Sequence, residues 1–223
     1  KNLTKYPVVI SQCETCFLIQ LKYSVSDKLL FSNNYSYLSG NSREKIYNFE
    51  SILAKIKKLS KKINPRILDV GSNDGSFLEL VRKKYPKVLG IEPTNTAEIS
   101  INKGIDTIKK PLNFKLAKKI VREYSKFDFI VATNLFAQSN NINEILESVR
   151  LILNKEGLLI VEVQYLYDLL FQKGFDSFHH EHIAYYTASS IMKVLKKYKL
   201  HVFDAEKLKV HGGMLRVYVS LYK

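Results

Sequence analysis

The stretch RILDVGSNDGSFLELVRKKYPKVLGIE, residues 66–92, decides the fold of this chain. It begins with a short apolar run at 67–70, passes through a turn of small residues at 71–75 and a helical segment, and ends in a second apolar run at 88–91. Apolar runs of this length on either side of a helix predict parallel strands that are buried in a sheet. The stretch is therefore predicted to form one βαβ unit.

The turn of this unit has the residue types of a ligand-binding loop. Gly71 and Gly75 allow the backbone to approach a ligand closely, and Asn73 and Asp74 tolerate a tight turn. Glu92 ends the second strand about 20 residues after Gly71, where an acid binds the two hydroxyls of a ribose. Together these residues predict a pocket for a nucleoside-bearing cofactor.

The spacing of the glycines narrows the class of cofactor. The turn reads G-x-x-x-G instead of the G-x-G-x-x-G of dinucleotide-binding proteins, and no Lys-Ser or Lys-Thr pair follows it, as a P-loop requires. Asp74 would repel a pyrophosphate, whereas an ammonium or sulfonium group suits an acidic turn. The sequence favours S-adenosylmethionine (SAM). The alternative is a doubly wound fold in which the turn is merely tight.

Alternating elements continue after Glu92. Three further strands are predicted at 104–108, 127–133 and 157–163, and helices at 44–62, 97–103, 112–124, 142–153 and 188–198. The last two apolar runs, 200–210 and 214–222, are too close together for a crossover, so they must form an antiparallel hairpin. The prediction is an α/β fold with helices on both faces of a parallel sheet, the plan of class I SAM-dependent methyltransferases.

The amino-terminal part of the chain is predicted to be an appendage. Cys13 and Cys16 are its two cysteines, and a C-x-x-C pair can supply half of a tetrahedral zinc site. The flanking residues favour a strand, a knuckle and a strand over a redox motif, and two further ligands are not evident. Residues 1–42 are thus expected to be a partial zinc-binding segment with a tyrosine-rich lid, and 43–223 the methyltransferase domain.

Composition limits the partners. The chain has 223 residues and a net charge of +14, which invites a nucleic-acid-binding function. However, the lysines are scattered over predicted helices and outnumber arginine, which is the better reader of phosphates and bases. We therefore expect these lysines to lie on solvent-exposed faces of helices, and we expect no nucleic-acid partner. Their positive electrostatic field would favour a small substrate that carries a phosphate. No apolar run could span a membrane and no leader is visible, so we expect a cytoplasmic protein without a membrane partner.

The segment FHHEHIAYYT, residues 178–187, follows the fifth predicted strand. It contains His179, His180 and His182 beside Glu181. Loops after parallel strands bind ligands, and a carboxylate next to a histidine raises its basicity and fixes its tautomer. The segment therefore predicts a site of proton transfer. A structural loop is the alternative, and a zinc site is less favoured because no partner segment with matching ligands is evident.

These motifs together resemble the sugar C-methyltransferase family, SAM enzymes that methylate a ring carbon of nucleotide-linked keto-sugars in deoxysugar synthesis. The matching pieces follow the family's order over nearly the whole chain: CETCFLIQL, NNYSYLSGNS, SNDG, GIEPTNTA, TNLFA, HEHIAYYT and HGGMLRVY. The HEH and HGG pieces are specific to the family, whereas the turn at SNDG is not.

The resemblance implies roles for individual residues. His182 would be the base that removes a proton beside the ketone, and Glu181 would be its catalytic partner. The enolate carbon would then attack the sulfonium methyl group in line. The cofactor site would comprise Gly71, Asn73, Asp74, Gly75, Glu92, Pro93 and Asn134. The catalytic set would comprise His182, Glu181, His179, His180 and, on the lid, Tyr35 and Tyr37.

The chain also departs from the family pattern. His179 stands where the family has a tyrosine, and Tyr165 and Gln138 stand where it has histidines. These changes touch the sugar side of the site and leave the cofactor side intact. An earlier cysteine pair and a carboxyl-terminal domain are missing, so we expect a relative that is shortened at both ends. The alternatives are methylation of an oxygen or nitrogen in another small molecule or in RNA, and a non-catalytic module that binds SAM or a sugar nucleotide. The sequence makes no prediction of oligomeric state.

Overall fold

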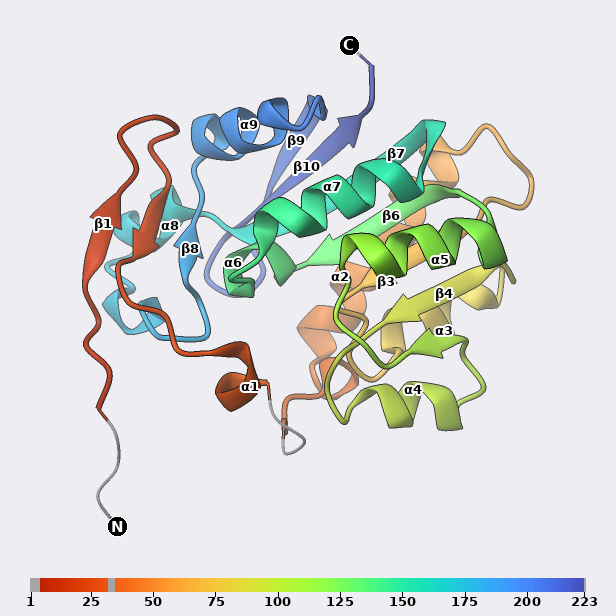
Figure 1. Ribbon diagram of the computed structural model, residues 1–223, viewed down its shortest axis with the longest axis horizontal. Helices are drawn as coiled ribbons and strands as arrows, with labels where there is room; N and C mark the ends of the chain where they lie inside the picture. Colours follow the sequence, from red (N-terminus) through yellow and green to blue (C-terminus); the bar gives the residue numbers. More distant parts are fainter. Residues whose placement is uncertain (1–4, 32–34, 223) are drawn as a thin grey trace.

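The computed structural model of the chain describes residues 5–31 and 35–222, which form two β-sheets of different size (Figure 1). The large sheet has seven strands in the order β5-β4-β3-β6-β7-β10-β9. β3 to β7 run parallel, and β10 is antiparallel to both of its neighbours. The predicted parallel sheet with a terminal antiparallel hairpin is confirmed. The strands are β3 (Ile67–Val70), β4 (Val88–Ile91), β5 (Thr107–Ile108), β6 (Phe127–Thr133), β7 (Leu153–Gln164), β9 (His201–Leu208) and β10 (Met214–Ser220).

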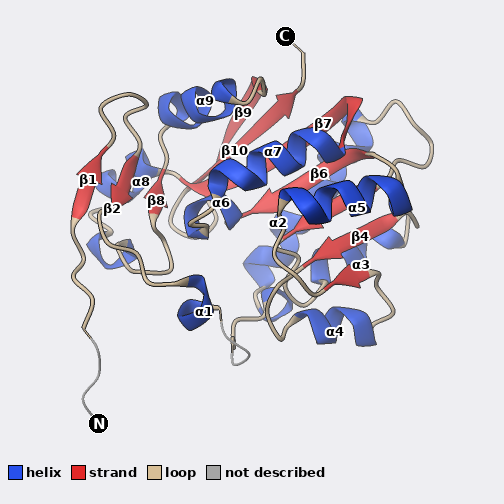
Figure 2. Cartoon of the chain, in the orientation of Figure 1, coloured by secondary structure: helices blue, strands red, loops and turns tan. Residues whose placement is uncertain are grey.

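Helices cover both faces of this sheet (Figure 2). Successive strand residues point to opposite faces, so Leu68 and Val70 pack in one core cluster and Ile67 in the other. The first cluster contains buried residues of α5 (Phe114–Tyr124), α7 (Ile142–Ile152) and α9 (Ala188–Lys197). The second contains buried residues of α2 (Arg43–Leu59) and α3 (Ser76–Arg82), while α4 (Ala97–Asn102) lies beside β5 at the sheet edge. No helix of the described chain is long and apolar enough to cross a membrane.

The small sheet joins two distant parts of the chain. β1 (Ile10–Gln12) and β2 (Ile19–Leu21) form the predicted hairpin around the cysteine knuckle. The third strand, β8 (Ala184–Tyr185), pairs with β2 and belongs to the histidine segment, which was predicted to be a loop. Tyr185 is fully buried in the cluster beneath this sheet and donates a hydrogen bond to the carbonyl of Ser177 at 3.1 Å. The amino-terminal segment therefore braces the histidine segment.

The lid that the sequence predicts, residues 27–42, contains two short helices, α1 (Asp27–Leu30) and the 3₁₀ turn η1 (Ser39–Asn41). Its residues 32–34 lie outside the described residues. Three further short helices flank the histidine segment and the strand ends: α6 (Leu135–Gln138), α8 (Leu166–Phe171) and η2 (Phe175–Ser177).

Helix α2 begins and ends where local hydrogen bonds dictate. The Ser42 hydroxyl caps its first turn by accepting the Lys45 N–H at 3.3 Å. The helix ends at Leu59, three residues earlier than predicted. There the Ser60 hydroxyl donates to the Lys62 carbonyl at 2.8 Å, a local bond that competes with another helical turn.

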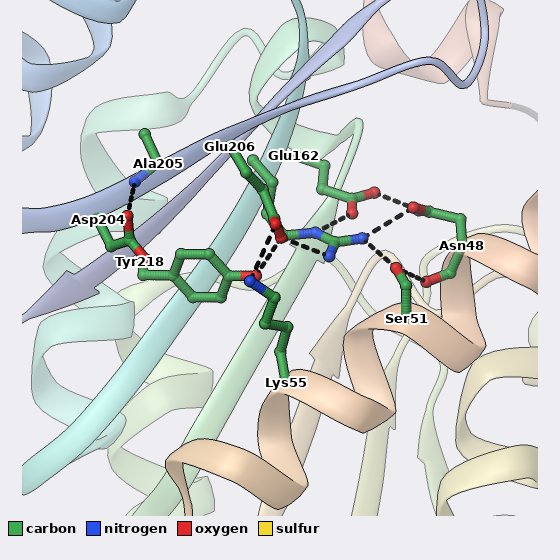
Figure 3. A network of polar contacts seen from close by, with 9 residues as sticks. Asn48, Ser51, Lys55, Glu162, Asp204, Ala205, Glu206 and Tyr218 are labelled. Atoms are coloured by element: carbon green, nitrogen blue, oxygen red, sulfur yellow. Dashed lines mark hydrogen bonds and ion pairs between the residues drawn. The ribbon is translucent and has the colours of Figure 1, made fainter.

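A buried ion pair fastens α2 to the sheet (Figure 3). Arg216 on β10 lies opposite Glu162 on β7, and its Nε donates to Glu162 Oε1 at 2.6 Å. Asn48 on α2 accepts from Arg216 at 2.8 Å and donates to the second Glu162 oxygen at 2.6 Å. Glu206 on β9 accepts from Arg216 at 2.8 Å. Because the pair is only 1% and 0% exposed, each charge depends on the other.

Glu162→Gln is expected to lower the free energy of unfolding by about 3–5 kcal/mol, because the Arg216 guanidinium loses its fully buried counter-charge. Urea unfolding measures this. The exposed pair of Lys61 and Glu156, at 3.9 Å, is the control, and Glu156→Gln should cost less than about 1 kcal/mol. Equal small losses in both variants would contradict the structural role of the buried pair.

Candidate active site

The order in which strands are added to the large sheet reverses between β3 and β6. From β3 it adds β4 and then β5 on one side, and afterwards β6 and β7 on the other. Parallel sheets bind ligands outside the strand ends at such a switch point. A cavity of about 350 Å³ lies there, which we call the switch-point cavity. Its wall includes the predicted cofactor residues Gly71, Asn73, Glu92, Pro93 and Asn134.

Glu92 fixes the shape of this cavity. One carboxylate oxygen accepts the N–H of Asn73 and the other accepts the N–H of Thr94, both at 2.9 Å. The side chain is buried, with 5% of its residue surface exposed. Each carboxylate oxygen has two acceptor positions, so a ligand with two neighbouring hydroxyls could still donate to both. Gly71 makes the turn possible because its φ of 81° is strained for any other residue.

Asp74 and Gly75 lie behind the cavity instead of in its wall. The Asp74 carboxylate accepts the N–H groups of Gly40, at 3.0 Å, and Ser76, at 3.2 Å. Gly75 is the left-handed cap of α3, and a Cβ there would collide with the Ser100 side chain. Asp74 therefore holds the lid and the first turn of α3, where the sequence predicted direct contact with the cofactor.

The lid is hydrogen-bonded across the switch-point cavity. Ser39 donates its N–H to the Asn73 side chain at 2.9 Å, and Asn73 donates back to the Tyr37 carbonyl at 3.0 Å. Tyr35 forms a second reciprocal pair with the Asn95 side chain, at 3.0 and 3.2 Å. The lid is therefore held closed from the β3 side and from the β4 side.

A second cavity of about 270 Å³, which we call the histidine pocket, adjoins the first. The two cavities share Tyr35, Tyr37, Asn134 and Gln138 as lining residues. The rest of the histidine pocket is lined by Gln164, His179, Glu181, His182, His211 and Met214. The structure thus brings most of the predicted cofactor residues and most of the predicted catalytic residues into the lining of two adjoining cavities.

His182 is oriented by an amide. Its Nδ1 lies 3.1 Å from Gln164 Oε1, so Nδ1–H donates and Nε2 is left to accept a proton. Burial, followed by electrostatic interactions with His179, His211 and Lys45, lowers the pKa of His182 to about 4. The expectation that a neighbouring carboxylate would raise its basicity is therefore wrong. The group at Nδ1 is uncharged, and desolvation of the imidazolium dominates.

His180 is not among the residues that line the histidine pocket. Its Nε2 lies 3.1 Å from the Tyr6 carbonyl, and the two rings pack edge to face with centroids 5.9 Å apart. Its position suits the packing of the amino-terminal segment, although the sequence grouped it with the catalytic residues.

Cys13 and Cys16 are free thiols that pack against the core of the large sheet. Backbone N–H groups of Cys16 and Thr15 donate to the Cys13 sulfur and lower its pKa. Within residues 5–31 and 35–222, no group of three His, Cys, Asp or Glu side chains could hold a metal ion. The described residues therefore do not supply the ligand set that a zinc ribbon requires.

Four residues at the site escaped the sequence analysis. Gln164 ends a strand, and His211 begins the HGG motif, so both positions could have been found by topology. Asp69 is an acid inside an apolar strand, and burial, followed by the charge of Glu92, raises its pKa to about 8. Lys45 is 2% exposed and lines the switch-point cavity. The sequence does not distinguish Lys45 from the other lysines of the same helix.

A family model described as a methyltransferase domain matches residues 44–204. The chain belongs to the methyltransferase domain family. The chain is 27% identical over 219 residues to the C-methyltransferase NovU of Streptomyces niveus, a match that covers 97% of the chain and 52% of the relative. The chain therefore spans about half the length of this curated relative.

Solved structures agree on the fold of the methyltransferase. One similar structure is magnesium protoporphyrin IX methyltransferase of Synechocystis PCC 6803 with bound S-adenosylhomocysteine (SAH). It superposes on this chain with a TM-score of 0.62 at 10% sequence identity, and the match covers 86% of this chain and 91% of that one. The PH0226 protein of Pyrococcus horikoshii OT3 has a TM-score of 0.62 and 17% identity, covering 82% and 94%. The chain has the class I SAM-dependent methyltransferase fold.

The lowered pKa of His182 makes stability depend on pH. Between the ordinary pKa of 6.5 and about 4, the unfolded chain takes up a proton at His182 and the folded chain does not. Stability is therefore expected to fall as the pH falls through this window, and His182→Asn should remove part of the fall. His211, whose pKa is also lowered, contributes with the same sign. Urea unfolding at about pH 7 and about pH 5 measures the difference. An equal fall in the wild type and in His182→Asn would contradict the assigned shift.

Proposed function

We propose that this methyltransferase transfers the methyl group of SAM to a ring carbon of a nucleotide-linked keto-sugar. SAM would occupy the switch-point cavity and the sugar would occupy the histidine pocket. The observation that carries the proposal is the shared wall of Tyr35, Tyr37, Asn134 and Gln138, across which two ligands could meet. The C-methyltransferase relative and the motifs of the histidine segment support carbon as the acceptor.

The residues of the switch-point cavity fit the parts of SAM. Glu92 can accept both ribose hydroxyls, and the apolar side chains of Pro111, Leu112 and Ile145 offer a surface for the adenine ring. Gly71 and Asn73 of the turn also line this cavity, and the methionine part would lie against them. SAM supplies an electrophilic methyl group on a sulfonium. The residues of the chain orient it and exclude water.

In the histidine pocket, Nε2 of His182 would remove the proton beside the ketone. With a pKa of about 4 the imidazole is neutral at physiological pH and ready to accept a proton, but it is a weak base. The developing enolate oxygen therefore needs hydrogen-bond donors. Burial raises the pKa of Tyr35 to about 12 and also raises that of Tyr37, so both phenols stay protonated and can donate. Glu181, which also lines the pocket, could bind a sugar hydroxyl.

Solvent hydrogen exchange tests this mechanism. A nucleotide-linked keto-sugar is incubated with the protein and SAH in deuterated water, and deuterium at the carbon beside the ketone is followed by NMR. The wild type is expected to exchange, and His182→Asn is expected to bind SAH normally while it loses at least about 100-fold in exchange rate. Undiminished exchange in His182→Asn would remove it as the base. Methyl transfer without any exchange would favour an oxygen or nitrogen acceptor, and binding without exchange or transfer would favour a non-catalytic module.

Glu92→Gln tests the cofactor side. The amide can accept at only one of its two positions, and its NH₂ group would face a backbone N–H of Asn73 or Thr94. Affinity for SAH, measured by calorimetry, is expected to fall about 10- to 100-fold. Glu98→Gln on the exposed side of α4 is the control and should bind SAH like the wild type. Unchanged affinity in Glu92→Gln would refute the ribose assignment.

A further inference from the structure

A buried lysine stands in the wall of the switch-point cavity. Lys45 lies in the first turn of α2, its residue surface is 2% exposed, and its side chain lines the same cavity as Gly71 and Asn73. Lysine is seldom buried to this extent unless its ammonium group is paired, because desolvation of the charge is costly. Burial accordingly lowers the pKa of Lys45. The position therefore calls for a counter-charge.

The acids around Lys45 do not provide that counter-charge. Neither Glu162 nor any other described acid forms an ion pair or a hydrogen bond with the Lys45 ammonium group. The two Glu162 oxygens are engaged by Arg216 and Asn48, both at 2.6 Å. Figure 3 shows Glu162 turned toward Asn48 in this network. Glu44 accepts the N–H of His211 at 2.9 Å.

Asp69 is the remaining acid that acts on Lys45. One oxygen of its buried carboxyl group has no hydrogen-bond partner among the described residues. Burial, followed by the charge of Glu92, raises its pKa to about 8, and the opposing charge of Lys45 does not offset this rise, so the group is largely protonated at neutral pH. Asp69 therefore leaves the positive charge of Lys45 without full compensation.

We propose that Lys45 pairs with the α-carboxylate of the methionine part of SAM and so makes the site selective for a cofactor that carries this carboxylate. The assignment rests on the proposed binding of SAM in the switch-point cavity. Lys45 lines that cavity together with Gly71 and Asn73, and it is not among the residues that line the histidine pocket. A ligand anion at this wall is therefore the cofactor carboxylate and not the enolate oxygen of the substrate. An ammonium–carboxylate pair in a buried site is among the stronger hydrogen bonds in proteins.

Decarboxylated SAM, which differs from SAM only in lacking the carboxylate, isolates this contact. The wild type is expected to bind SAM about 10- to 100-fold more tightly than decarboxylated SAM. In Lys45→Met, affinity for SAM should fall by a similar factor while affinity for decarboxylated SAM stays unchanged, so the preference disappears. Lys45→Arg keeps a cation and should keep a preference for SAM. Calorimetry gives all of these affinities.

Two further measurements separate the pairing from a structural role. Lys57→Met, on the exposed side of the same helix, removes one positive charge and should leave both affinities unchanged. The melting temperature of ligand-free Lys45→Met should be no lower than that of the wild type, because a buried charge has been removed, while the rise in melting temperature on adding SAM should shrink. If Lys45→Met does not fold, Lys45→Gln serves the same comparison.

The outcomes are distinct. A preference for SAM that survives in Lys45→Met, or an equal loss of affinity for both compounds, would overturn the pairing. Normal binding of SAM with loss of turnover alone would also overturn it and would move Lys45 to the enolate. A wild type that binds neither compound would overturn the proposed function itself, and with it this assignment.

Discussion

The carboxylate of Glu92 is the contact on which the site depends. By accepting one N–H from the turn after β3 and one from the segment after β4, it holds two strand ends at a fixed separation. Asn73, whose N–H it binds, in turn holds the lid through two hydrogen bonds of its side chain. Without this carboxylate, the turn after β3 would lose the hydrogen bond that fixes Asn73, and the lid is bonded to Asn73. A single acid thus links the βαβ unit to a segment some 35 residues earlier in the chain.

The lid decides how the two cavities relate. Because the lid is bonded to the turn, Tyr35 and Tyr37 stand between the switch-point cavity and the histidine pocket and belong to both. The opposite side of the wall is built by Asn134 and Gln138, which follow β6. The histidine segment arrives from far downstream and is braced by β8 in the small sheet. Residues from separate parts of the chain therefore line two cavities that share four lining residues.

The periodicity of apolar residues predicted the helices and strands, and the order of the strands predicted which of their ends lie close together. The βαβ unit, the hairpin and the placement of Glu92 and His182 at one edge followed from period, spacing and chain direction. The contact of His180 with Tyr6, the hydrogen bond of Asp74 to the lid and the pairing of β8 with β2 could not be predicted, because each depends on a partner distant in sequence. The pKa of His182 was predicted in the wrong direction for the same reason. Its partner is Gln164, not the adjacent Glu181.

Buried charge divides the site into two halves with different tasks. On the α2 side, Lys45 is a buried cation, and Glu162 and Arg216 form a buried ion pair. On the other side, His182 is kept neutral by burial and can act only on a group that a neighbour polarises. Such a division suits a reaction between a charged donor and a neutral carbon acid.

A crystal structure of the protein with bound SAH tests the central claim most directly. The account predicts the ribose hydroxyls on Glu92 and the sulfur at the wall of Tyr35, Tyr37 and Asn134, with the imidazole of His182 facing it across the histidine pocket. A sulfur that points away from this wall, or an imidazole of His182 turned to bulk solvent, would contradict it.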